Sequence, residues 1–279
     1  MELRTRALQA LQLVTPEAKC EAVQALWSAR QAWRFGPVPP TPGPLPGRPA
    51  RPRLIPPGEV PHRTPYTAEG RAALVHAICH IEFNAINLAL DAVWRFDGMP
   101  EDFYRDWMQV AYEESQHFDM LHRELQSLGH RYGDFEAHDG LWEMCEKTAG
   151  DITARMALVP RTLEARGLDA TPLIQARLRK VGTPDALRIV DCLDVILREE
   201  IGHVDIGNRW YRWLCEGQSL EPVRHYKMLV DRYRAPRLRP PFNLAARQAA
   251  GFSVEEIAYL SGDGLPDLSP AGGAARAGS

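Results

Sequence analysis

Apolar residues recur every three or four positions through much of the chain, which is the spacing of one face of an α-helix. The pattern predicts long helices over residues 67–96, 100–128 and 183–216. Thr67 is suited to cap the first of them, and Pro184 suits the first turn of the last. We therefore predict an all-α fold built around these helices.

A fourth long helix is expected in two pieces. The first piece covers residues 151–166, and Pro160 is expected to kink it. Gly167 and Pro172 should then break the helix, because proline has no backbone N–H to donate and clashes with the preceding turn. Residues 173–180 are again helical in pattern.

Shorter segments flank this core. From Gly36 to Pro65 the chain contains twelve prolines, which predict an extended segment over the surface. Short helices are expected at residues 3–13, 16–32, 141–148, 220–234 and 243–260. The expected organisation is an N-terminal part (1–66), a core helical domain (67–217), a C-terminal helical extension (218–260) and a disordered tail rich in Gly, Ala and Ser (261–279).

Acids and imidazoles interrupt the apolar faces of the long helices. The first helix carries Glu82, the second carries Glu114 and His117, and the last carries Glu200 and His203. A Glu and a His three positions apart share one helix face, so each pair can present both groups to one point. A third Glu-x-x-His match, at residues 59–62, lies in the proline-rich segment, where no helix can hold it.

The spacing of these residues places them at similar heights along two helical hairpins. Glu82 and Glu114 each lie 16 residues from Gly98, which is ~24 Å at 1.5 Å per residue. Glu164 and Glu200 each lie 18 residues from Gly182, or ~27 Å by the same rise. If the hairpins pack as a four-helix bundle, four carboxylates and two imidazoles meet in its interior.

Such a set of ligands favours a pair of metal ions. Four buried carboxylates repel one another unless cations lie between them, and oxygen and nitrogen ligands suit Fe or Mn. The predicted metal ligands are Glu82, Glu114, His117, Glu164, Glu200 and His203. Glu143 and Glu146 lie near Glu164 in sequence and remain alternatives to it.

Each helical Glu-x-x-His pair is preceded by another acid. Glu113 and Glu199 can accept the second N–H of the histidines across the bundle, Glu113 from His203 and Glu199 from His117. The alternative is that each is a solvated surface glutamate.

Composition and charge narrow the class of protein further. The net charge is −3, with 26 acidic and 16 basic residues in 67–220 and 7 basic against 2 acidic residues in 221–250. Five widely spaced cysteines without a Cys-x-x-Cys pair argue against a disulfide framework. The N-terminus has no apolar signal region and no apolar run reaches the roughly 18 residues of a membrane span. A soluble, cytoplasmic protein is expected.

The pattern resembles the ferritin-like di-iron superfamily, in which two helices each give a Glu and two give Glu-x-x-His. The repeated Glu-Glu-x-x-His motif is similar to the motifs of acyl-carrier desaturases and bacterial multicomponent hydroxylases. The segments Pro46–Pro52, His80–Glu82, Leu163–Gly167 and Pro241–Asn243 resemble a bacterial ferritin-like family known as a domain of unknown function, which is itself similar to MiaE-type tRNA hydroxylases. The resemblance covers roughly residues 5–260 and implies a ferritin-like four-helix bundle with the six ligands above.

The function expected from these features is oxidation of a substrate by O₂ at two Fe ions, with Mn or a mixed Fe/Mn pair as alternatives. An external donor is expected to supply the electrons. A tRNA nucleoside is one candidate substrate, suggested by the MiaE similarity and by the basic stretch 221–250. That stretch could instead dock on the acidic core. Two other functions stay open: iron or peroxide handling of the ferroxidase kind, and a helical scaffold without metal.

Overall fold

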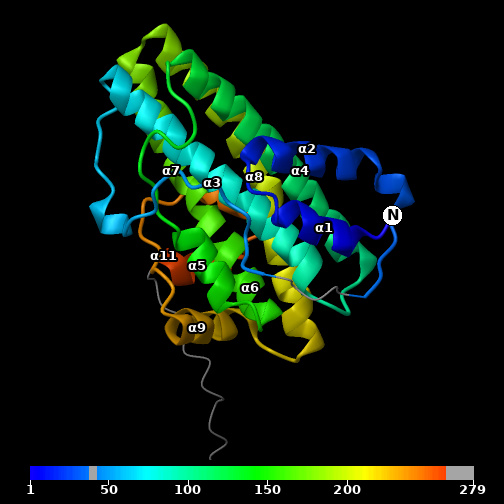
Figure 1. Cartoon of the computed structure of the whole chain (residues 1–279). Helices are drawn as coiled ribbons and strands as arrows, with labels where there is room; N and C mark the ends of the chain where they lie inside the picture. Colours follow the sequence, from blue (N-terminus) through cyan, green and yellow to red (C-terminus); the bar gives the residue numbers. More distant parts are fainter. Residues whose placement is uncertain (38–42, 262–279) are drawn as a thin grey trace, which may run out of the picture.

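The structure is a computed structural model that describes residues 1–37 and 43–261. Its regular structure in these residues is helical, apart from two isolated β-bridges, Glu2 with Arg34 and Leu54 with Ala137, so the all-α prediction is confirmed (Figure 1). The α-helices are α1 (Leu3–Leu11), α2 (Pro16–Ser28), α3 (Ala68–Arg95), α4 (Glu101–Ser127), α5 (Gly140–Lys147), α6 (Ile152–Leu158), α7 (Ala165–Val181), α8 (Pro184–Gly217), α9 (Pro222–Tyr233), α10 (Leu244–Ala249) and α11 (Val254–Ser261).

Helices α3 and α4 form a long antiparallel hairpin at the centre of the fold (Figure 1). Thr67 caps α3, because its Oγ1 accepts a hydrogen bond of 3.0 Å from the backbone N–H of Gly70. Gly98 turns the chain with a φ of 71°, a conformation that glycine adopts without strain. Pro100, where this helix was predicted to begin, is instead its N-cap, and α4 begins at Glu101.

The fourth long helix differs from its prediction. Residues 159–164 form a π-helical stretch, η3 (Val159–Glu164), where a kink at Pro160 was expected. Helix α7 then runs without a break through Gly167 and Pro172, so the predicted interruption is wrong. Pro172 cannot donate to the carbonyl of Leu168, and the side-chain amide of Asn243 donates to that oxygen instead, at 3.2 Å.

Helix α8 packs antiparallel on α4 and also lies against η3 and α7. The direction is visible in its ion pairs, because Arg188 near its start reaches Glu124 near the end of α4, whereas Arg209 reaches Asp106 near the start of α4. The apolar period of α3 and α8 places Ile81 and Leu187 on inner faces of their helices, but in the structure these side chains are 45% and 44% exposed. The buried seams are therefore rotated slightly from those predicted.

The N-terminal helices cover the α3–α4 hairpin, with α1 against α3 and α2 against α4 (Figure 1). They end earlier than predicted, and a one-turn 3-10 helix, η1 (Arg30–Ala32), follows α2. The described part of the proline-rich segment is extended except for one turn, η2 (Pro57–Glu59). Arg48 pairs with Asp139 at 2.7 Å and thereby ties this segment to the loop before α5.

At the C-terminal end, α9, α10 and α11 pack beside α6, α7 and α8. Buried Arg247 of α10 pairs with Asp169 of α7 at 2.6 Å, as expected if the basic stretch docks on the core. Its other basic residues are exposed: Arg224, Lys227, Arg232, Arg234, Arg237 and Arg239. The tail predicted to be disordered lies outside the described residues from 262 onward.

Helix α3 is, contrary to the sequence expectation, long and apolar enough to cross a membrane by length and composition. However, 72% of its most apolar window is buried inside the structure. Its hydrophobicity is thus explained by its central position between α1 and α4. All five cysteines are free thiols.

Candidate metal centre

Six polar side chains meet in the interior between α3, α4, η3 and α8. Glu82 comes from α3, Glu114 and His117 from α4, Glu164 from the last residue of η3, and Glu200 and His203 from α8. Each is buried, with at most 8% of its surface exposed. Helical spacing explains the two pairs, because residues three apart lie on one face.

Four of these residues form the tightest group. Glu82, Glu114, His117 and Glu200 can each offer one ligand atom such that all four atoms lie within 4.8 Å of one another. His203 adjoins them, since its Nδ1 lies 3.0 Å from Oε1 of Glu114 and 3.7 Å from Oε1 of Glu200. These distances are short enough for cations placed between the side chains to touch several of them.

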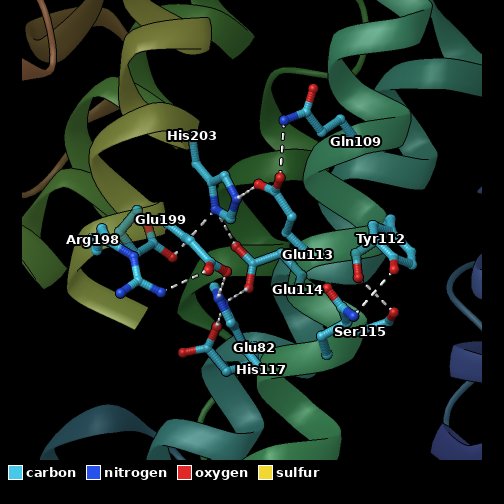
Figure 2. A network of polar contacts seen from close by, with 12 residues as sticks. Glu82, Gln109, Tyr112, Glu113, Glu114, Ser115, His117, Arg198, Glu199 and His203 are labelled. Atoms are coloured by element: carbon cyan, nitrogen blue, oxygen red, sulfur yellow. Dashed lines mark hydrogen bonds and ion pairs between the residues drawn. The ribbon is translucent and has the colours of Figure 1, made fainter. Parts of the chain in front are cut away.

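The two imidazoles are oriented alike (Figure 2). Each turns Nδ1 toward the carboxylate cluster and Nε2 toward an outer glutamate, so that His117 Nε2 lies 2.8 Å from Glu199 and His203 Nε2 lies 2.8 Å from Glu113. The two contacts cross between α4 and α8, as the sequence had suggested. A carboxylate on the outer nitrogen fixes the ring and favours the tautomer whose inner nitrogen is free to bind a metal.

Several buried carboxylate oxygens lack a hydrogen-bond partner. They are Oε2 of Glu82, Oε2 of Glu200 and both side-chain oxygens of Glu164. Glu82 Oε2 lies 3.4 Å from His117 Nδ1 without forming a hydrogen bond. Buried polar atoms are nearly always satisfied, so a cluster of such oxygens is one that could accept a cation.

The acid–base properties of the cluster agree with this interpretation. Burial and the neighbouring charge of Glu114 raise the pKa of Glu82 to about 8. Burial and repulsion by Glu200 and Glu114 raise the pKa of Glu164 well above its usual range. Burial lowers the histidine pKa values, but the surrounding glutamates outweigh it and raise the pKa of both His117 and His203. The cluster therefore retains protons wherever no other cation compensates its charge.

Glu164 is buried and interacts electrostatically with the cluster, whereas its two sequence alternatives are exposed. The carboxylates of Glu200, Glu114 and Glu82 all act electrostatically on Glu164. Glu143 and Glu146 are exposed on α5. The π-helical stretch, which the sequence did not predict, is the element that presents Glu164.

Two further residues support the outer glutamates and were missed from the sequence. Gln109 donates from Nε2 to Glu113 at 2.9 Å, and Arg198 donates from Nη2 to Glu199 at 3.3 Å (Figure 2). Gln109 stands four positions before Glu113, a spacing that could have been recognised. Burial opposes the ionisation of Glu113, but the hydrogen bonds from His203 and then from Gln109 outweigh it and lower its pKa. The hydrogen bond from His117, followed by the contact with Arg198, lowers the pKa of Glu199.

The fold and the cluster define an all-helical protein with a buried carboxylate–imidazole site that could hold a metal ion. The chain belongs to a family described as protein of unknown function (DUF455), whose model matches residues 12–258. It is similar to an uncharacterized protein of Haemophilus influenzae, with 48% identity over 219 residues, covering 76% of this chain and 75% of the relative. No solved structure matches the chain.

Proposed function

We propose that the protein is a ferritin-like four-helix bundle that holds two metal ions and uses them to oxidise a substrate with O₂. The ions are held by Glu82, Glu114, His117, Glu164, Glu200 and His203. The observation that carries the proposal is the set of unsatisfied buried carboxylate oxygens near two imidazoles whose outer nitrogens already have carboxylate partners. Oxygen and nitrogen ligands without thiolate favour iron or manganese.

The residues divide their roles by position. Two ferrous ions would supply two electrons for the activation of O₂, and an external electron donor would restore them. Glu113 and Glu199 hold the Nε2 protons of His203 and His117, which keeps each Nδ1 directed inward. The six side chains are at most 8% exposed, which limits the access of bulk water to them.

A tRNA nucleoside is one candidate substrate. The support for it is the exposed basic stretch of α9 and the residues after it, where six Arg and Lys side chains face solvent. Such a surface can bind phosphate groups of a nucleic acid. Mass spectrometry of nucleosides from a strain lacking the gene should show one modified nucleoside lost and its precursor accumulated. An unchanged nucleoside profile would exclude this substrate.

Iron or peroxide handling uses the same cluster differently. A ferroxidase consumes O₂ with ferrous iron alone and releases ferric product, whereas an oxygenase couples O₂ consumption to a second substrate. Oxygen uptake by the ferrous protein without added substrate separates the two. Repeated turnover with release of ferric mineral would favour iron handling.

The metal centre itself is tested by metal analysis of protein from iron-replete cells. We expect two Fe or Mn per chain in the wild type, and loss of metal in Glu114→Ala and in His203→Ala with most helix retained. Glu143→Ala is the matched control, because it removes an exposed acid of α5 and should leave the metal content unchanged. A wild type without stoichiometric metal would support the scaffold alternative, and two metals retained in either cluster variant would contradict the ligand assignment.

A further inference from the structure

Helix α11 contributes a buried acid that contacts the π-helical stretch η3. Its Glu256 is 3% exposed and forms an ion pair of 2.8 Å with Nη2 of Arg161, whose side chain is 2% exposed. Arg161 lies in η3, three residues before Glu164. The buried ion pair between α11 and the π-helical stretch therefore involves a residue within one turn of Glu164, a proposed metal ligand.

Arg161 is held from several sides. Its Nη1 donates to Oδ1 of Asn208 on α8 at 3.0 Å, and Asn208 in turn donates to the carbonyl of Ala250 at 2.6 Å. The guanidinium also lies about 5 Å from three aromatic rings, those of Tyr211, Tyr226 and Phe252. Its position is thus fixed by α8, α9 and the C-terminal segment together.

Glu256 is fixed as firmly. It forms a capping box with Ser253, because its carboxylate accepts from the Ser253 N–H at 2.7 Å while Ser253 Oγ accepts from the Glu256 N–H at 3.2 Å. The carboxylate that pairs with Arg161 is therefore rigidly placed at the start of α11.

Helix α8 adds a second constraint on η3. A Cβ added at Gly207 would lie 2.6 Å from the side-chain carbons of Pro160, so glycine is needed for the close approach of α8 and η3. Thr162 stabilises the π-helical turn from within, since its Oγ1 donates to the carbonyl of Ala157 at 2.8 Å. Each contact fixes a residue of η3 other than Glu164.

By contrast, Glu164 makes no hydrogen bond of its own through either side-chain oxygen. Its place in the cluster depends on the backbone that carries it. From this we infer that Glu256 is a positioning residue, which acts through Arg161 to hold η3 in the conformation that presents Glu164 to the metal centre. The inference rests on the proposed function and assigns the C-terminal segment a role in it.

The test compares Glu256→Gln with Glu255→Gln. Gln keeps the shape of Glu256 and its hydrogen bond to Ser253 but removes the charge opposite Arg161. Glu255 is the matched control, because it is exposed and accepts a hydrogen bond from Ser253 Oγ instead of pairing with Arg161. Each full-length protein is freed of metal, checked for helix content by circular dichroism, and titrated with Co²⁺ while the visible absorption is recorded.

We expect the wild type and Glu255→Gln to bind two Co²⁺ with the same spectrum. Glu256→Gln should bind one of the two ions roughly 10–100-fold more weakly, with a changed spectrum, as is typical when a residue that orients a ligand is lost. A purely stabilising role would lower the melting temperature but leave the affinity and spectrum of the folded protein unchanged, and that result would overturn the inference.

A second pair of variants decides the matter if Glu256→Gln does not fold. Gly207→Ala should push η3 away from α8 and weaken the binding of the same Co²⁺ ion. Gly202→Ala lies on the same helix with open space at its Cβ and should leave Co²⁺ binding unchanged. Unchanged Co²⁺ binding in Gly207→Ala would contradict the positioning role alone. A wild type that binds no Co²⁺ would contradict the metal centre, and the positioning role with it.

Discussion

Two buried acids on α3, Glu82 and Asp91, lie nine positions apart and differ in almost every other respect. Asp91 is fully buried and accepts hydrogen bonds from Arg155 at 2.6 Å and from Arg95 at 2.7 Å. Burial opposes its ionisation, but these two cations outweigh burial and lower its pKa. Glu82 has the imidazole of His117 at 3.4 Å in place of two guanidinium groups, one of its oxygens is unsatisfied, and its pKa rises to about 8.

The difference separates two uses of buried charge. The acid of an internal ion pair is compensated by the protein itself and therefore contributes to the fold. The acids of the cluster around Glu82 are compensated only by one another's protons and by two imidazoles. A buried acid that the fold leaves without a cation is the one suited to bind a cation from outside.

The largest change in the free energy of unfolding is expected when Asp91 loses its partner. Arg155→Met removes the strongest partner of Asp91 and leaves that carboxylate undercompensated, so the free energy of unfolding should fall by about 3–5 kcal/mol. Urea unfolding measures it, with Arg166→Met as a control at an exposed arginine of α7. A loss as small as that of the control would remove the distinction between the two acids.

Replacing an acid of the cluster should change the free energy of unfolding in the opposite direction. Glu164→Gln removes a carboxyl group whose burial and neighbours oppose its charge, so the metal-free protein at pH 7 should become more stable, by less than the change expected at Arg155. The same substitution should weaken metal binding. Asp91→Asn is the matched comparison and should destabilise the protein. If both substitutions destabilise the metal-free protein alike, the cluster is structural.

A buried cation gives a smaller, pH-dependent effect. Lys19 of α2 is buried and donates to the carbonyls of Leu11 and Gly47, and burial followed by the charge of Arg48 lowers its pKa from 10.5 to about 7. Between these two values the unfolded chain keeps the proton and the folded protein has released it, so stability should rise with pH.

The rise from pH 7 to pH 9 should be about 2 kcal/mol larger in the wild type than in Lys19→Met. Urea unfolding at pH 7, 8 and 9 measures it. Lys180→Met, at an exposed lysine of α7, should keep the wild-type slope. Parallel slopes for the wild type and Lys19→Met would show that Lys19 stays protonated in the folded protein.

The long helices and the positions of the cluster residues could be predicted because local signals specify them. Thr67 and Gly98 bound α3, and the polar residues stand out against apolar faces of regular period. The height estimate from two turns also placed the glutamates at similar levels, although it applied the rise of a straight helix to a segment that was expected to be interrupted at Gly167 and Pro172.

What could not be predicted depends on contacts distant in sequence. Pro172 appeared to break α7, but its lost hydrogen bond is replaced by Asn243, more than 70 residues later. The π-helical stretch is likewise held by Glu256 and Gly207, which no pattern near Pro160 reveals. The exposure of Ile81 and Leu187 was also not predicted. It depends on how neighbouring helices rotate against each other, and the pattern of a single helix does not contain that information.

The crossed contacts between α4 and α8 also fix the axial register of the two helices. His117 reaches Glu199 and Glu113 reaches His203, so each helix contributes one imidazole and one carboxylate to the pair of bonds. Sliding α8 along α4 by a single residue, ~1.5 Å, would disturb both bonds at once. The alignment of two helices of this length is thus set at mid-span, and thermal sliding between them should be smallest at the level where the six side chains meet.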